Sequence, residues 1–173
     1  MDDLSALKES LARERPGQWD SLPDLELYMD QVLNYMPRQQ IIFRPEAQLT
    51  AAMINNYIKA GLLHRTNGKR YSRPHLALLT AICVLKQILS VRDISTLFSA
   101  FPSGSTKNIY EKYHAALDEQ LTAVAADLPE DKDPSSLPEA AIYYAIASYA
   151  NKVACERIID IISKNNSEEK QKK

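Results

Sequence analysis

The residues best suited to binding chemistry in this chain are amides and cations in the run MINNYIKAGLLHRTNGKRYSRPHL, from Met53 to Leu76. Adjacent side-chain amides at Asn55 and Asn56 can pair with the N6 and N7 atoms of adenine. The cations of Lys69 and Arg70 can neutralise phosphates. These residue types indicate contacts with double-stranded DNA. The candidate DNA-binding residues are Asn55, Asn56, Lys59, Arg65, Asn67, Lys69, Arg70 and Arg73.

Charge is distributed unevenly along the 173 residues, although the formal net charge is only −1. Residues 47–92 carry seven basic side chains and no acidic one, whereas residues 1–46 and 93–173 each have a net charge of −4. Chance together with a solvated helix face is one explanation of this segregation. The alternative, which we favour, is a surface that attracts a polyanion.

Helical spacing of apolar residues and recurrent capping residues predict an all-α protein with one small β-hairpin. The hairpin is expected over residues 62–71 with its tip at Asn67-Gly68, because Asn-Gly is a strong hairpin signal. The helix starting at Ser72 is apolar nearly all round and should be the most buried. Helices are predicted over residues 3–14, 21–36, 50–60, 72–89, 90–101, 106–127 and 138–163.

The order of helix, glycine stop, basic hairpin and buried helix is that of a winged helix-turn-helix. In that fold the helix at 50–60 would enter the major groove, and the wing at about 64–71 would lie against phosphates. This interpretation divides the chain into a DNA-binding domain at 1–101, a C-terminal helical region at 106–163 and a disordered tail at 164–173.

The segment LTAAMINNYIKAGLL resembles the recognition helix of MerR-type regulators, and KRYSRPHLALLTAICVLKQILSVRDISTLF is similar to their wing end and following helix pair. Together with LPDLELYMDQVLNYM, these blocks resemble more closely an uncharacterised bacterial group, the domain of unknown function 1836 family, over about residues 21–101. The resemblance implies a MerR-like DNA-binding fold and no established activity. Asn55 stands where MerR-type proteins usually carry Arg, and IIFRPEAQ departs from the first helix of their motif.

Enzymatic function is not expected from this sequence. His64, His75 and His114 have no spacing that suits a metal or a catalytic triad, and four glycines cannot build a phosphate loop. No metal or cofactor is therefore predicted, and a small-molecule effector is unidentified. The charged, amphipathic N-terminus and the absence of a long apolar run predict a cytoplasmic protein that does not cross a membrane. Cys83 and Cys155 lie far apart, as expected of core residues in a reducing compartment.

The rival interpretation is a helical protein–protein interaction module that has kept the fold and lost DNA binding. The position of the seven basic residues discriminates between the two, since a DNA-binding surface would gather them beside Asn55 and Asn56. A homodimer is expected because one helix reads only a few base pairs. Its interface would lie on the helices at 106–127 and 138–163, with an apolar stripe from Ile142 to Ile162. The competing explanation is that these two helices fold back within a monomer.

Overall fold

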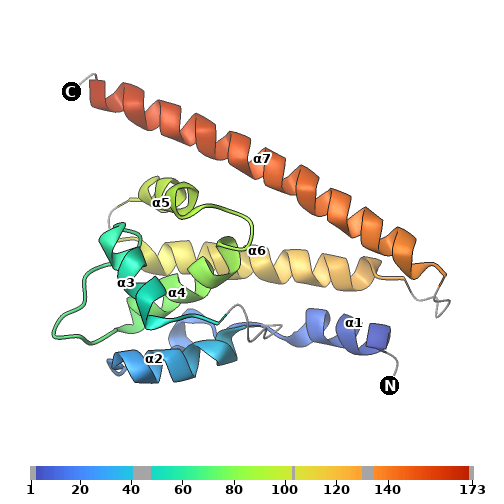
Figure 1. Cartoon of the computed structure of the whole chain (residues 1–173), viewed down its shortest axis with the longest axis horizontal. Coiled ribbons are helices and arrows are strands. Elements are labelled where there is room, and N and C mark those ends of the chain that lie inside the picture. Colours follow the sequence, from blue (N-terminus) through green and yellow to red (C-terminus); the bar gives the residue numbers. More distant parts are fainter. Residues whose placement is uncertain (1–2, 41–47, 103, 130–134, 172–173) are drawn as a thin grey trace. The chain divides into compact units, whose positions relative to one another are not determined.

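A computed structural model describes residues 3–40, 48–102, 104–129 and 135–171 of the chain (Figure 1). The described residues form α-helices and short 3-10 helices, with no β-strand among them. In chain order the elements are α1 (Asp3–Arg13), η1 (Trp19–Ser21), α2 (Met29–Tyr35), η2 (Met36–Gln39), α3 (Ala51–Lys59), α4 (Arg73–Leu85), α5 (Val91–Ser99), α6 (Thr106–Asp127) and α7 (Leu137–Gln171).

Internal contacts divide the chain into two compact units. One comprises residues 15–116, and the other combines residues 1–14 with residues 117–173. The boundary therefore falls inside α6, between Ala116 and Leu117. The sequence predicted a boundary at residues 102–105 instead, and it assigned α1 to the N-terminal domain.

Helix α4 is the most buried helix of the 15–116 unit, and the sequence predicted it to be the most buried. Its residues from His75 to Ile82 are all buried, including Leu76, Leu79 and Ile82, which are 0% exposed. Burial of a leucine or isoleucine side chain contributes roughly 1.5–3 kcal/mol, so this helix supplies much of the stability of the unit. Within the same helix, burial raises the pKa of the Cys83 thiol to about 11, in agreement with a core role for this residue.

Tyr110 attaches the segment before α2 to the first half of α6. Its side chain is 1% exposed and forms a buried cluster with Leu22 and Ala77. The phenol donates a hydrogen bond to the carbonyl of Gly17, and the ring lies 6.3 Å from that of Trp19. This contact spans more than ninety residues of sequence and explains why α6 begins within the 15–116 unit.

Helices α1, the second half of α6, and α7 make up the other unit. Ala125, Leu128 and Ile159 are its buried apolar residues among those described. The Tyr144 phenol donates a 3.1 Å hydrogen bond to Asp127 Oδ2. Helix α7 continues past Ser163 to Gln171, so residues 164–171 are helical where the sequence predicted a disordered tail.

The predicted β-hairpin wing is wrong, because the flanks of the turn use their backbone groups elsewhere. The amides of Leu62 and Leu63 both donate to the carbonyl of Tyr57, at 2.9 and 3.2 Å, and so terminate α3. Gly61, at φ +72°, provides the left-handed residue that this helix ending requires. Leu62 and Leu63 are also both buried, whereas successive residues of a strand point to opposite faces.

The other side of the predicted hairpin pairs with a distant segment. Tyr71 exchanges two backbone hydrogen bonds with Leu27, of 2.8 and 2.9 Å. Only Asn67 and Arg70 pair across the turn, through one 3.2 Å bond. Within the described residues the feature is thus a tight turn attached to the segment before α2, and a winged helix-turn-helix has no support.

The helix predicted over residues 21–36 is also shorter than expected. Ser21 ends a 3-10 turn, and the α-helix begins only at Met29, where the Tyr28 backbone amide donates to the Gln31 side chain. Residues 22–28 are not helical because Leu22 is in the core and Leu27 pairs with Tyr71. Leu25, predicted to lie on an apolar helix face, is 78% exposed.

Candidate nucleic-acid interface

Helix α3 presents the predicted amides to solvent. Thr50 caps it by accepting a hydrogen bond from the Met53 amide, and Ile54 and Tyr57 turn inward and are buried. Asn55, Asn56 and Lys59 point away from this buried side and are exposed. Lys59 follows the two amides by four and three positions, so the structure brings three of the predicted site residues together on the exposed side of α3.

The loop after α3 carries most of the other predicted residues. His64, Arg65, Asn67, Lys69 and Arg70 are exposed there. Figure 1 shows this loop leaving α3 and returning past α2 into α4. Gly68 and Lys69 have positive φ angles of 59° and 64°, the pattern of a type I′ turn. We call residues 64–71 the basic turn.

Lys69 stands in a conformation that costs an L-amino acid about 1 kcal/mol or more. Its φ of 64° is the single positive value at a non-glycine position among the described residues. The Lys69 side chain is exposed to solvent and is not part of the core. The sequence placed the turn one residue earlier, with its tip at Asn67-Gly68.

Two of the predicted DNA-binding cations are paired with carboxylates of the segment before α2. Arg73 Nη2 lies 3.1 Å from Asp24 Oδ1, and its side chain is only 22% exposed. Arg70 Nη1 lies 3.9 Å from Glu26 Oε2, and its guanidinium is 5.7 Å from the centre of the Tyr28 ring. Sequence reasoning missed both pairs, because they depend on the long-range pairing of Leu27 with Tyr71.

Lys59, Arg65 and Lys69 differ from these two arginines. No described residue forms an ion pair with any of the three. A ligand would therefore not have to displace an ion-pair partner among the described residues to reach these charges. We refer to Lys59, Arg65 and Lys69 as the open cations.

His75 supports the end of the basic turn and does not belong to the exposed surface. Its Nδ1 accepts a 3.1 Å hydrogen bond from the Ser72 amide, which closes a capping box at the start of α4. Since an amide can only donate, the neutral ring carries its proton on Nε2, which is buried and has no partner. Burial lowers the pKa of His75, so the capping form is the neutral one.

The described residues were also compared with the requirements of a metal site and of a membrane-spanning helix. No three histidine, cysteine, aspartate or glutamate side chains within these ranges gather in a way that could hold a metal ion. None of the described helices combines the length and apolar character that crossing a bilayer requires.

Comparison with known proteins gave one match. No curated protein and no solved structure matches the chain, so the resemblance to MerR-type regulators has no support. The family model described as "Domain of unknown function (DUF1836)" matches residues 17–116. These limits nearly coincide with those of the compact unit at residues 15–116, and they extend beyond the resemblance seen at residues 21–101. The chain therefore belongs to the DUF1836 family.

Proposed function

We propose that the 15–116 unit binds double-stranded DNA through the exposed face of α3 and the basic turn, as a regulator of transcription. One observation carries the proposal: two exposed amides are followed by three open cations within a segment that has no acidic residue. Lys59, Arg65 and Lys69 would contact phosphates, and Asn55 and Asn56 would read base edges. Arg73 is not part of this contact set, since Asp24 already occupies its guanidinium.

Salt-dependent binding to random-sequence duplexes tests the proposal directly. Fluorescence anisotropy with a labelled duplex, measured between about 50 and 200 mM salt, reports the number of phosphate contacts through the slope of log affinity against log salt. We expect binding at low salt and a slope of about −3 or steeper for three or more contacts. Failure to bind any duplex at low salt would exclude this function.

Replacing Asn55 or Asn56 by alanine should change sequence preference more than total affinity. A bidentate contact with adenine discriminates by about 1–3 kcal/mol, so adenine should lose its advantage at the contacted position. Selection from a random duplex library by the wild-type protein and by each variant measures this change. Asn151→Ala, at an exposed position of α7, is the matched control. Unchanged selection profiles in both variants would remove these amides from base recognition.

We also propose that the protein is a homodimer that uses α7. The supporting observation is a set of large apolar side chains that remain exposed along this helix. Ile142, Ile146 and Tyr149 are 65%, 62% and 66% exposed, and Val153 continues their spacing of four, three and four residues. That spacing is typical of a helix seam that packs against a second helix. A stable interface would need to bury about 1,200 Å² or more.

Charged substitutions in this seam test the dimer. The double variant Ile146→Glu, Tyr149→Glu should convert a dimer into a monomer at micromolar concentration, because four carboxylates would meet in one apolar interface. Multi-angle light scattering measures the mass. Ser148→Glu adds a carboxylate at an exposed polar position between them and should leave the dimer intact. A wild-type protein that is already monomeric at this concentration would contradict the proposal.

The interaction-module alternative is favoured by a different observation. The ion pairs of Arg70 and Arg73 with Glu26 and Asp24 neutralise two of the seven basic residues in the 47–92 segment. A protein that used this segment for packing and not for DNA would be expected to contain such pairs. The same anisotropy measurement separates the two functions, since this alternative predicts no salt-dependent binding to duplexes.

A further inference from the structure

The cap at the start of α4 depends on a side chain that can gain a proton. His75 is 7% exposed, and its Nδ1 accepts the hydrogen bond from the Ser72 amide. The Ser72 hydroxyl lies 2.9 Å from the same nitrogen. A protonated Nδ1 can only donate, so the charged ring cannot accept the amide hydrogen. The cap therefore exists only with neutral imidazole, and histidine is the side chain that commonly changes charge between about pH 5 and 8.

A second cap of the same design does not use a titratable group. At the start of α2, Gln31 Oε1 accepts a 2.9 Å hydrogen bond from the Tyr28 amide, three residues earlier. Ser72 and His75 are separated by the same three positions and satisfy the same kind of backbone donor. Glutamine is a usual residue at this position of a capping box. Of the two capping side chains, only His75 responds to protons.

The backbone next to this cap attaches the basic turn to the segment before α2. Tyr71 precedes Ser72 and exchanges its two hydrogen bonds with Leu27. The Tyr71 ring also stands edge-on to the His75 imidazole, with 5.6 Å between the ring centres. Both side chains are buried. Movement of the His75 ring would therefore disturb the Tyr71 side chain and, through it, the pairing with Leu27.

The surroundings of His75 favour the neutral ring on balance. Burial is the largest influence and lowers the pKa of His75, and the charge of the His64 imidazole acts in the same direction. The carbonyls of His64 and Arg65 and the Glu26 carboxylate act to raise this pKa. Neither carbonyl is at hydrogen-bonding geometry, because the buried Nε2 has no partner among the described residues. Burial raises the pKa of the adjacent Tyr71 phenol, which is therefore neutral in this pH range.

We propose that His75 makes the attachment of the basic turn sensitive to acid. Protonation from solvent removes the acceptor of the Ser72 amide and places a charge in a buried position, so the ring moves out into water. The first turn of α4 then frays, and the pairing of Tyr71 with Leu27 opens. This inference is independent of DNA binding, because it rests on the cap and the pairing and uses none of the open cations.

The direction of the pKa shift fixes the pH range of the effect. The ordinary pKa of histidine is 6.5, and the pKa of His75 in the closed form is lower. Above pH 6.5 the ring is neutral in both forms, and the closed form keeps its full stability. As the pH falls below 6.5, the open form binds the proton first, so its population relative to the closed form rises by up to about tenfold per pH unit. The rise ends at the lower pKa of the closed form.

Amide hydrogen exchange in the full-length protein, followed by NMR between about pH 5 and 7.5, tests the inference. Protection factors correct each rate for the intrinsic pH dependence of exchange. From pH 7 to pH 5.5, the protection of the Leu27, Tyr71 and Ser72 amides should fall by about two- to eightfold, the range expected for one proton. The Ile82 amide, in the buried part of α4, should remain more strongly protected throughout, as expected of local opening.

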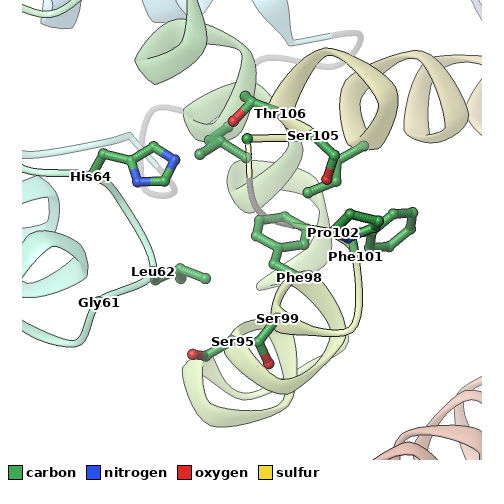
Figure 2. Close-up of a pocket in the computed structure, with 13 residues that line it drawn as sticks. Gly61, Leu62, His64, Ser95, Phe98, Ser99, Phe101, Pro102, Ser105 and Thr106 are labelled. Carbon is green, nitrogen blue, oxygen red and sulfur yellow. The ribbon is translucent and has the colours of Figure 1, made fainter.

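Two variants assign the response to one imidazole. His75→Gln should keep the cap and lose the response, because glutamine can accept the Ser72 amide as Gln31 accepts that of Tyr28. His64→Gln is the matched control and should respond like the wild-type protein. His64 is exposed, and Figure 2 shows its ring at the side of a pocket, across from Phe98.

The comparison excludes the neighbouring charged groups as the cause, because all three proteins contain Asp24, Glu26 and Arg73. Should the glutamine variant not fold, the ring ¹⁵N resonances of His75 in the wild-type protein give a second measurement. They should report protonation over the same pH range in which protection falls. The proposal is overturned if protection of the three amides is constant from pH 7 to 5.5, if His75→Gln responds like the wild type, or if His64→Gln abolishes the response.

Discussion

Alanine at Lys59, Arg65 and Lys69 together is expected to reduce affinity for random duplex DNA on the order of 100-fold at low salt, and to lower the salt slope by about 2.7. The reason is that each open cation would release close to one counterion from the phosphate backbone, independently of sequence. None of the three changes breaks an ion pair with a described residue, so the fold should persist. Alanine at position 69 keeps a Cβ atom and therefore adds no strain to the turn.

A matched triple variant separates a local contact from a general effect of charge. Lys112, Lys152 and Lys164 are exposed and lie on α6 and α7. Their replacement by alanine removes the same total charge from positions outside residues 47–92, and affinity and salt slope should change little. Circular dichroism checks that both variants remain folded. Equal losses in the two triple variants would show that net charge, and not the segment around α3, governs binding.

Tyr110→Ala is expected to lower the free energy of unfolding by about 3–5 kcal/mol, the usual cost of truncating a buried aromatic residue. The side chain is 1% exposed, and its ring lies 5.7 Å from that of Tyr113 and 6.2 Å from that of His114. Tyr110→Phe keeps the ring and loses the hydroxyl with its hydrogen bond to Gly17, at about 0.5–1.5 kcal/mol. Urea unfolding followed by the fluorescence of Trp19, the single tryptophan of the chain, measures both changes.

The exposed Tyr28 provides the control for this comparison. It is 49% exposed, and Tyr28→Ala should lower the free energy of unfolding by much less than Tyr110→Ala does.

The stabilisation from Tyr110 also depends on pH in a defined direction. Burial raises the pKa of its phenol above the ordinary value of 10.0, so the contribution is complete below pH 10 and declines as the pH rises further. A loss of less than about 1 kcal/mol in Tyr110→Ala would contradict the central position assigned to this residue.

Local signals in the sequence predicted most of the helices of this fold. The predicted range 106–127 coincides with α6, and Thr50, Ser72 and Ser90 begin α3, α4 and α5 as expected. Capping and helical periodicity depend on residues within one or two turns, so they can be read without knowledge of the tertiary structure. The same reasoning failed at Ser21, where burial of Leu22 prevails over a capping pattern.

The residue composition of the candidate interface could be predicted from the sequence. Its long-range backbone hydrogen bonds and its ion pairs could not. The run without acidic residues from position 47 to 92 is visible in the sequence, and so is the tight turn near Asn67. The hydrogen bonds between Leu27 and Tyr71 are not visible, because more than forty residues separate the two. That pairing replaces the expected hairpin, and it also brings Asp24 and Glu26 to the arginines. A single long-range contact thus accounts for both the wrong wing and the missed ion pairs.

The left-handed backbone at Lys69 lowers the stability of the fold. A chain optimised for stability alone would carry glycine or asparagine at this position, since both tolerate the conformation better than lysine. The lysine side chain is exposed and has no described ion-pair partner that would offset the cost within the fold. Residues held in such sparsely populated backbone conformations tend to cluster at functional sites. At position 69 the chain therefore carries an exposed positive charge on a left-handed backbone, at a cost in stability of about 1 kcal/mol or more.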